Sequence, residues 1–149
     1  LFTVSLETNY TVDIDPRATF FHPNELREGT QPPEIIDLAE VGVSHPDELT
    51  LEVLGDYNYN GGYSNTTIGV FSGSSRILDK SEPKRVPDAI DAGEDFRNGM
   101  KNIPEDFKIS PYVSVTVPAG ATHLFVGSGD NPVYDNEDEN DNYELSITK

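Results

Sequence analysis

Carboxylate and amide side chains crowd one short segment of the chain, residues 130–142, which reads DNPVYDNEDENDN and contains no Lys, Arg, His or Cys. Asp130, Asp135 and Asn136 follow directly on an apolar, strand-like run. Such oxygens are the ligands that Ca²⁺ prefers, since this ion takes about 6–8 of them at ~2.3–2.6 Å. Placing so many carboxylates on one turn is costly without a cation. The segment therefore predicts a calcium site, and a solvated acidic hairpin tip is the alternative.

A second polar segment, residues 55–65, carries Asp56, Asn58 and Asn60 ahead of a glycine. This D-x-N-x-N-G pattern matches the first half of an EF-hand calcium loop, in which alternating side chains point into one concavity. The twelfth position is Thr67 rather than Glu, and strands rather than helices flank the segment, so a true EF-hand is excluded. An ordinary turn is the alternative, because Asn and Asp favour turns.

Acidic residues gather a third time in residues 88–95, which read DAIDAGED. Asp91 and Asp95 are candidates to supply the carboxylate that the second segment lacks, or to bind an ion of their own. A solvated loop is the alternative.

Four tyrosines lie in these polar segments, namely Tyr57, Tyr59, Tyr63 and Tyr134. An exposed Tyr combines an apolar ring with a polar hydroxyl. Beside a cation this suits sugar recognition, in which the ring face stacks on the apolar side of a pyranose. Packing over the end of the fold is the alternative for each. Tyr59 and Tyr63 are therefore candidate ligand-binding residues.

Motifs of catalysis are missing from the chain. The three histidines form no H-x-x-H or H-E-x-x-H pair, and the serines around Gly73 do not make a G-x-S-x-G nucleophile elbow. A hydrolase that uses paired carboxylates needs only two acids and stays open as a further hypothesis. We expect a binding protein rather than an enzyme.

The net charge of the chain restricts the classes of partner that it can bind. The 149 residues contain 10 Lys and Arg against 27 Asp and Glu, which gives a formal net charge of −17 at pH 7. Such a chain repels phosphate backbones and anionic membrane surfaces, so we expect no nucleic-acid partner. No apolar run approaches the ~18–20 residues of a membrane span, so membrane insertion is not expected either. The chain has no Cys and therefore no disulfide. A secreted domain without disulfides often needs another source of stability, and bound Ca²⁺ is suited to that role.

Strand-sized runs separated by Gly, Pro, Asn and Asp must position these segments. Alternating or apolar runs predict strands at residues 1–14, 35–43, 49–54, 66–71, 112–117, 122–126 and 143–147. Residues 76–111 are interpreted as a long irregular connection. With no convincing long helix, the pattern predicts a single domain over residues 1–149, an all-β antiparallel sandwich with long acidic loops.

With these residues in view, the chain resembles the PA-I-type bacterial galactophilic lectins. The matching segments are residues 44–59 (SHPDELTLEVLGDYNY), residues 68–74 (IGVFSGS) and residues 115–147, which include the acidic segment and the alternating strand after it. The resemblance implies a jelly-roll-like β-sandwich in which Ca²⁺ directly coordinates two sugar hydroxyls. Asp130, Asp135 and Asn136 would then be side-chain ligands of the ion.

The same resemblance implies further contacts. The carbonyl oxygens of Tyr59 and Val133 would be backbone ligands of the ion, and Asn131 would lie against the sugar. Where the family has a His and a Gln that contact galactose, this chain offers Tyr63, Ser64 and Asn65.

Two functions of different classes follow. The first is a calcium-dependent carbohydrate-binding module, cut from a larger secreted protein, that binds a glycan or cell-surface carbohydrate. The alternative is a calcium-stabilised adhesin domain whose acidic end binds an extracellular peptide or protein. Both place the chain outside the cell or at its surface.

Overall fold

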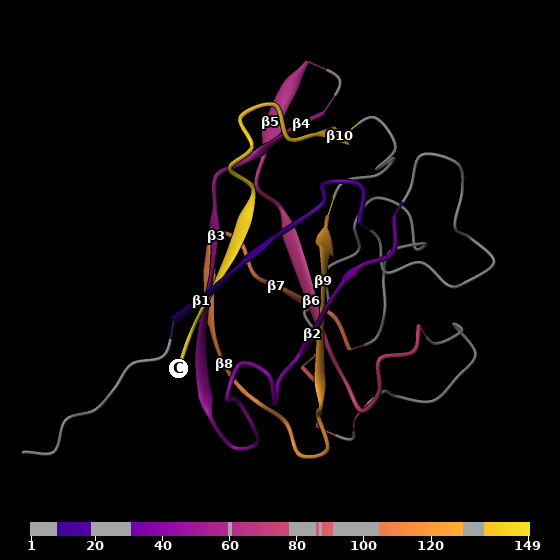
Figure 1. Ribbon diagram of the computed structural model, residues 1–149, viewed down its shortest axis with the longest axis vertical. Coiled ribbons are helices and arrows are strands. Elements are labelled where there is room, and N and C mark those ends of the chain that lie inside the picture. Colours follow the sequence, from indigo (N-terminus) through magenta and orange to yellow (C-terminus); the bar gives the residue numbers. More distant parts are fainter. Residues whose placement is uncertain are drawn as a thin grey trace, which may run out of the picture.

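The computed structural model describes residues 9–18, 31–59, 61–77, 86, 88–90, 105–129 and 136–149. These residues form eleven strands and no helix. Two four-stranded antiparallel sheets face each other, and a three-stranded sheet stands at one end of the pair (Figure 1). The predicted all-β sandwich is confirmed.

Each sheet draws its strands from distant parts of the chain. The first sheet has the order β1-β11-β3-β8, in which β1 spans Asn9–Asp13, β11 Glu144–Thr148, β3 Glu48–Leu54 and β8 Tyr112–Thr116. The second has the order β2-β9-β6-β7, in which β2 spans Glu34–Asp37, β9 His123–Ser128, β6 Thr67–Ser72 and β7 Phe107–Lys108. The small sheet has the order β10-β4-β5, in which β10 spans Asn136–Glu137, β4 Tyr57–Tyr59 and β5 Gly62–Ser64.

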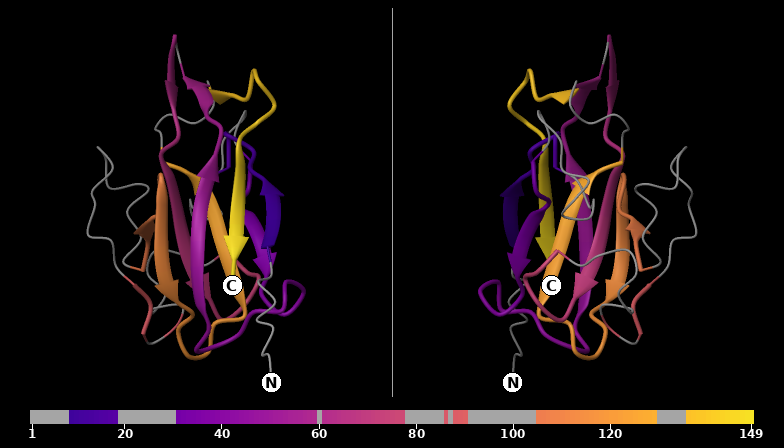
Figure 2. Two further views of the ribbon diagram at one scale, coloured as in Figure 1. Left: turned by 90° about the vertical axis from the view of Figure 1, so that its left-hand side faces the viewer. Right: turned by 90° about the vertical axis from the view of Figure 1, so that its right-hand side faces the viewer.

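The chain crosses repeatedly from one large sheet to the other. It runs from β1 to β2, returns to β3, passes through β6 and β7, and then alternates through β8, β9 and β11. Together with the strand orders, this is the connectivity of a jelly roll, which consists of two Greek keys. The connections β1–β2, β3–β6 and β9–β11 meet at the end that carries the small sheet (Figure 1, Figure 2).

Strict alternation along β3 fills the core of the sandwich. Leu49, Leu51 and Val53 are buried, and the polar residues between them are exposed. Leu51 lies opposite Val113 on one side of the ladder and opposite Ile147 on the other. Burying a side chain of this size contributes about 1.5–3 kcal/mol. The predicted strand and its apolar face are confirmed.

Strand β6 is buried along its whole length, because both of its faces are covered. Phe71 belongs to the main core between the sheets. Ile68 and Val70 point the other way and form a smaller cluster with Phe125, against which Ile77 packs. A strand covered on both faces is typically a continuous apolar run, and the sequence of β6 has that character.

The strand predicted over residues 35–43 is shorter than expected. Only β2 is extended, and the chain then turns from Leu38 to Gly42. Asp37 starts this turn by accepting the amide of Ala39 on its Oδ1 at 3.0 Å, and Gly42 ends it with a φ of +71°. A side-chain acceptor that competes for the backbone amide stops the strand. Near the start of the chain, Asn9 begins β1 instead of lying in the expected bend.

Three segments interpreted as irregular contain strands. Residues 55–65 form the hairpin β4–β5, residues 130–142 contain β10, and residues 76–111 contain β7. These strands have two or three residues each, which is too short for alternation to be visible in the sequence. Pairing with a neighbour, rather than local propensity, makes them strands.

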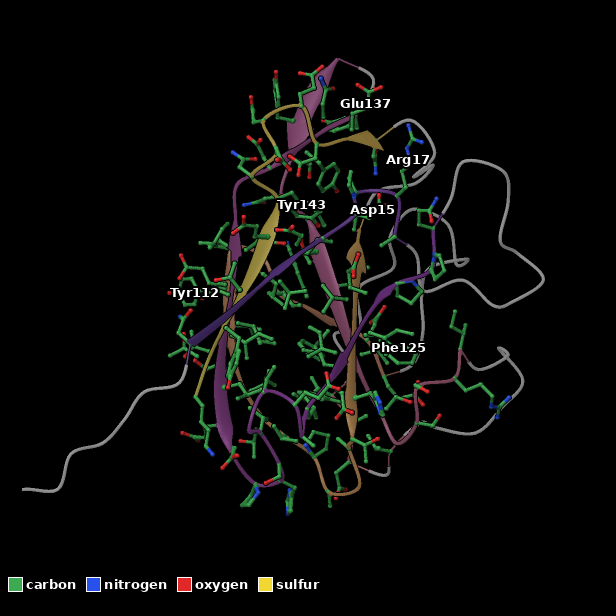
Figure 3. The ribbon with its side chains drawn as sticks, in the orientation of Figure 1. Asp15, Arg17, Tyr112, Phe125, Glu137 and Tyr143 are labelled. Carbon is green, nitrogen blue, oxygen red and sulfur yellow. The ribbon has the colours of Figure 1, made fainter. Side chains whose placement is uncertain are left out.

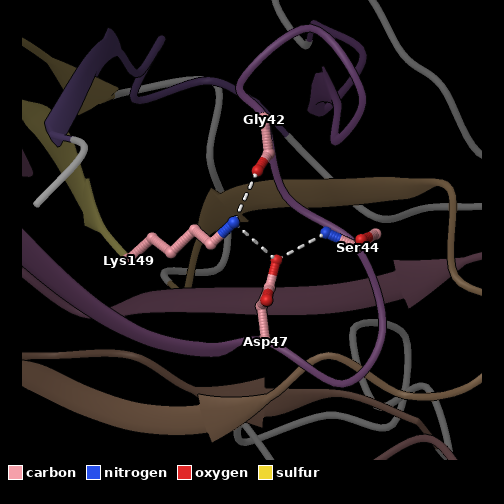
Figure 4. A network of polar contacts seen from close by, with 4 residues as sticks. All are labelled: Gly42, Ser44, Asp47 and Lys149. Carbon is pink, nitrogen blue, oxygen red and sulfur yellow. Dashed lines mark hydrogen bonds and ion pairs between the residues drawn. The ribbon is translucent and has the colours of Figure 1, made fainter. Parts of the chain in front are cut away.

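A polar network ties the end of the chain to the β2–β3 connection, away from the small sheet (Figure 4). Lys149 Nζ lies 3.1 Å from Asp47 Oδ2 and donates to the carbonyl of Gly42 at 3.1 Å. The same Asp47 oxygen accepts the amide of Ser44 at 3.0 Å. The hydrogen bonds that Asp47 accepts from the Ser44 amide and from the Lys149 side chain lower the pKa of its carboxyl group. Because the network is exposed to solvent, it adds little to the free energy of unfolding. Its main effect is to fix the conformation of the β2–β3 connection.

Candidate functional site

The small sheet joins the two segments that the sequence marks as separate ion sites. Strand β10 pairs with β4 so that Asn136 lies opposite Tyr59 and Glu137 opposite Asn58 (Figure 1). Asn136 comes from the acidic segment and Tyr59 from the D-x-N-x-N-G segment. The structure thus brings together one predicted side-chain ligand and the residue whose carbonyl was predicted as a backbone ligand.

Two features favour the β4–β5 hairpin, namely the sequence of its turn and the packing of an aromatic side chain where the hairpin joins the sandwich. Tyr59 pairs with Gly62, and the sequence between them is Asn-Gly, the preferred sequence for a type I′ hairpin; Gly61 has a φ of +90°. At the root of the hairpin Tyr57 is 1% exposed and packs against Tyr143 with 4.9 Å between ring centroids. The interpretation of Tyr57 as an exposed loop aromatic is therefore wrong. Tyr59 and Tyr63 are exposed, as expected.

Asn136 is fully buried, and its side chain joins β10 to the β1–β2 connection. Its Nδ2 donates to the carbonyl of Pro16 at 2.9 Å, and Ser128 Oγ donates to the same carbonyl at 2.9 Å. Arg17 Nε in turn donates to the carbonyl of Asn136 at 3.2 Å. The segment around Pro16 is therefore held by three hydrogen bonds, two of them to β10 and one to the end of β9.

The side-chain oxygen of Asn136 has no partner among the residues that the structure describes. Its Oδ1 is buried and accepts no hydrogen bond from the described part of the chain. A buried acceptor in this state costs about 1–3 kcal/mol. The side-chain oxygen of Asn is a hard, neutral ligand of the kind that Ca²⁺ binds. In Asn136 the hydrogen bond made by Nδ2 holds this oxygen in place. This residue therefore fits the predicted ion.

A hollow of about 390 Å³ lies beside Asn136, between β10 and the β1–β2 connection. Its lining residues are Asp15, Pro16, Arg17, Gln31, Asn136, Glu137 and Asp138. Three carboxylates and one guanidinium give this lining a formal charge of −2. Figure 3 shows Asp15, Arg17 and Glu137 at this end of the molecule, close to Tyr143. A divalent cation would cancel the charge, so the electrostatics of the hollow favour cation binding.

Asp138 has a structural task that explains part of the acidic segment. Its Oδ1 accepts the amide of Asn142 at 3.0 Å, and its Oδ2 accepts the amide of Tyr143 at 3.2 Å. Asp141, with a φ of +50°, lies inside the turn that these bonds close. Asp and Asn are common where a side chain must hold a turn in this way. The density of acids in residues 130–142 thus reflects turn formation as well as any ion.

The D-x-N-x-N-G segment does not wrap around a point as an EF-hand loop does. Asn58 lies in β4 and Asp56 just before it, on extended backbone that spaces alternate residues by about 7 Å. Asn58 is half-buried between Glu137 and Tyr63 in the cross-strand row. Asp56 lines a second hollow instead. The expected concavity is replaced by a flat hairpin.

Several predicted residues lie outside the described part of the chain. They are Asn60, Asp91, Asp95, Asp130, Asn131, Val133 and Asp135. Within the described part, no three Asp, Glu, His or Cys side chains come together as a metal site. The ion ligands predicted from residues 130–135 and 91–95 therefore stay predictions.

The role of the β1–β2 connection was missed by sequence reasoning. The sequence predicts only that a strand ends at about residue 14, and no local signal indicates that the Pro16 carbonyl accepts hydrogen bonds from Asn136 and Ser128. Two of the histidines make ordinary contacts: His45 Nδ1 lies 2.8 Å from the carbonyl of Val117, and His123 Nδ1 lies 2.7 Å from Thr122 Oγ1. These two histidines lie on different elements, and His22 lies outside the described residues.

Comparison with known proteins finds no matching family model, no matching characterised sequence and no matching solved structure. The resemblance to galactophilic lectins therefore rests on the residues quoted for it. The described residues include no helix with the length and hydrophobicity needed to cross a lipid bilayer.

Proposed function

We propose that this domain is a calcium-dependent carbohydrate-binding module of the lectin type. The observation that carries the proposal is the pairing of β10 with β4, which sets Asn136 opposite Tyr59, with a buried Oδ1 that has no partner among the described residues. Two segments far apart in the sequence, each rich in hard oxygen ligands, thereby share one end of the sandwich. The loop end of a β-sandwich is also where recognition residues commonly lie.

Asn136 would hold the ion together with Asp130, Asp135 and the carbonyl oxygens of Tyr59 and Val133. When bound, Ca²⁺ supplies open coordination positions that two sugar hydroxyls can occupy. The chain supplies the rest of the recognition. Tyr59, which is 39% exposed, offers part of its ring at the rim, and Asn131 would lie against the sugar.

The fixed geometry around Asn136 favours binding, because this side chain does not have to be ordered when an ion arrives. Its amide is anchored on Pro16, and its backbone is paired with β4 and bonded to Arg17. A preorganised site loses less conformational entropy on binding. Affinity for a single sugar is nonetheless expected to be weak, with multivalent presentation supplying the remainder. We place such a module outside the cell or at its surface, where millimolar-range calcium sites are common.

The first test is a thermal melt in millimolar Ca²⁺ and in excess chelator. An ion at about 100 times its dissociation constant adds ~2.7 kcal/mol. In a domain of this size that corresponds to a rise in Tm of roughly 5–10 °C. Asp130→Ala should abolish the rise. Glu48→Ala, which removes an exposed carboxylate at the other end of β3, is the matched control and should leave the rise unchanged.

A glycan array in Ca²⁺ and in chelator then tests the ligand class. Glycan binding that chelator and Asp130→Ala both remove supports the proposal. An unchanged melting temperature in chelator would contradict the calcium site. A calcium-dependent melt with a blank array would instead favour the adhesin alternative, in which the acidic end binds a peptide or protein.

A further inference from the structure

A second hollow lies at the opposite edge of the small sheet. Gly55, Asp56, Tyr63, Ser64 and Asn65 line an open hollow of about 280 Å³. Since the strand order is β10-β4-β5, this hollow borders β5, whereas the hollow at Asn136 borders β10. The two hollows share no lining residue. They are separate places on the same end of the sandwich.

The floor of the second hollow is held rigidly by hydroxyl groups. Ser64 Oγ accepts the amide of Thr66 at 3.1 Å and donates to Thr66 Oγ1 at 3.0 Å. The carbonyl of Asn65 accepts the hydroxyls of Ser110 at 2.5 Å and Thr67 at 2.9 Å. These bonds fix the backbone that carries the lining side chains.

Tyr63 offers a fixed aromatic face at the wall of this hollow. Its side chain is 58% exposed, and its hydroxyl donates to Glu139 Oε2 at 3.3 Å. The hydrogen bond restricts the ring while leaving much of its surface open to solvent. A ring that is restricted before binding is a better stacking partner than a free one.

Asp56 and Asn65 offer polar groups beside that ring. Asp56 Oδ1 is buried and accepts no hydrogen bond from the described residues. The Asn65 side-chain amide likewise makes no hydrogen bond within the described part of the chain, while its backbone carbonyl makes two. A carboxylate accepts hydroxyl protons, and an amide both donates and accepts. The hollow therefore combines one aromatic face with both kinds of hydrogen-bonding group.

We propose that this hollow is a saccharide subsite that binds one pyranose ring without calcium. The apolar face of the sugar stacks on Tyr63, and its hydroxyls bond to Asp56 and Asn65. The volume is just below the ~300–1,000 Å³ of pockets for drug-sized ligands, so it suits one ring rather than a long chain. The lining holds no apolar pocket for a peptide side chain. The inference rests on the ligand class of the proposed function but uses none of the predicted ion ligands of the first hollow.

The test uses three probes, methyl β-D-galactopyranoside, methyl β-D-glucopyranoside and methyl α-D-mannopyranoside, in excess chelator. Saturation-transfer NMR detects contact of each probe with the protein, and a titration gives its dissociation constant. At least one of the three is expected to bind in chelator. Tyr63→Ala should weaken that binding by about twofold to tenfold, the usual range for loss of an aromatic stack.

Two further variants test whether the loss of binding is specific to the aromatic ring of Tyr63. Tyr63→Phe keeps the ring but loses the hydroxyl bond to Glu139 that restricts it, so its affinity should lie between those of the wild type and Tyr63→Ala. Tyr112→Ala removes a tyrosine that is 67% exposed on β8, away from the small sheet, and should not change binding (Figure 3). Equal weakening by Tyr63→Ala and Tyr112→Ala would overturn the subsite.

The outcomes separate this inference from the proposed function. Sugar binding that persists in chelator, with no calcium effect on the melt, supports the subsite and contradicts the calcium module. Binding seen only in Ca²⁺, or no binding of any probe in chelator, overturns the subsite, whatever the melt shows.

Discussion

Replacing Tyr143 by Phe should change how the stability of this domain depends on pH. Tyr143 is 1% exposed, and its hydroxyl lies 2.6 Å from Thr67 Oγ1. Thr67 gives its own proton to the carbonyl of Asn65, at 2.9 Å, so Tyr143 is the donor in the pair. The contact joins the start of β11 to β6, directly beneath the small sheet.

Near neutral pH the variant should be less stable. It loses one buried hydrogen bond, which contributes about 0.5–1.5 kcal/mol. Thr67 keeps its bond to Asn65, so no buried donor is left without a partner. The ring contact with Tyr57 is retained, because Phe has the same ring.

At alkaline pH the order should reverse. Burial raises the pKa of Tyr143 well above its ordinary range, and the hydrogen bond to Thr67 offsets this only in part. The unfolded chain releases the phenol proton from pH ~10, whereas the folded chain keeps it. The contribution of Tyr143 is therefore complete below pH ~10 and falls by about 1.4 kcal/mol per pH unit above it. Starting from an advantage of ~1 kcal/mol, the wild type and Tyr143→Phe should be equally stable at about pH 10.6.

Urea unfolding at intervals from neutral to strongly alkaline pH measures this crossing. Tyr112→Phe is the control, because it removes a hydroxyl from an exposed ring, and it should follow the wild type throughout. A constant difference between wild type and Tyr143→Phe at every pH would refute the reasoning. It would mean that the folded and unfolded states ionise this phenol alike.

Two further predictions concern packing. Leu51→Ala should lower the free energy of unfolding by about 2–5 kcal/mol, because Leu51 is fully buried at the centre of β3; a loss below about 1 kcal/mol in urea unfolding would contradict that placement. Gly55→Ala should destabilise more than Gly42→Ala, although the two glycines have φ values of +72° and +71°, because a Cβ at Gly55 would collide with the backbone of Asn142 whereas one at Gly42 meets nothing within 4 Å. Equal losses in melting temperature would show that backbone conformation alone sets the cost.

Much of the sandwich could be predicted from local pattern. Five of the predicted strands correspond to β3, β6, β8, β9 and β11 with ends within about two residues, the usual uncertainty of such boundaries. The short strands could not be found in this way. A strand of two or three residues shows no period, and it exists because a neighbour supplies its hydrogen bonds.

Residue types alone predicted two separate polar loops, whereas the lectin resemblance implied that Tyr59 and Asn136 share one ion, and the difference has a physical reason. Sequence marks residues by type, so Asn136 and Tyr59 could each be assigned to a polar segment. Their pairing depends on how the jelly roll brings the β3–β6 and β9–β11 connections to one end. The three tyrosines of residues 57–63 illustrate the same limit, since packing against Tyr143 buries Tyr57 and leaves Tyr59 and Tyr63 exposed.

By itself, the sequence determined the class of fold and the apolar face of the long strands. Alternation acts over a few residues, so it can be read locally. Only the tertiary structure decided that Asn136 is buried, with its amide bonded to Pro16 and its Oδ1 without a partner in the described part of the chain. These residues are 120 positions apart, and their contact is set by the closure of the two sheets rather than by any local preference.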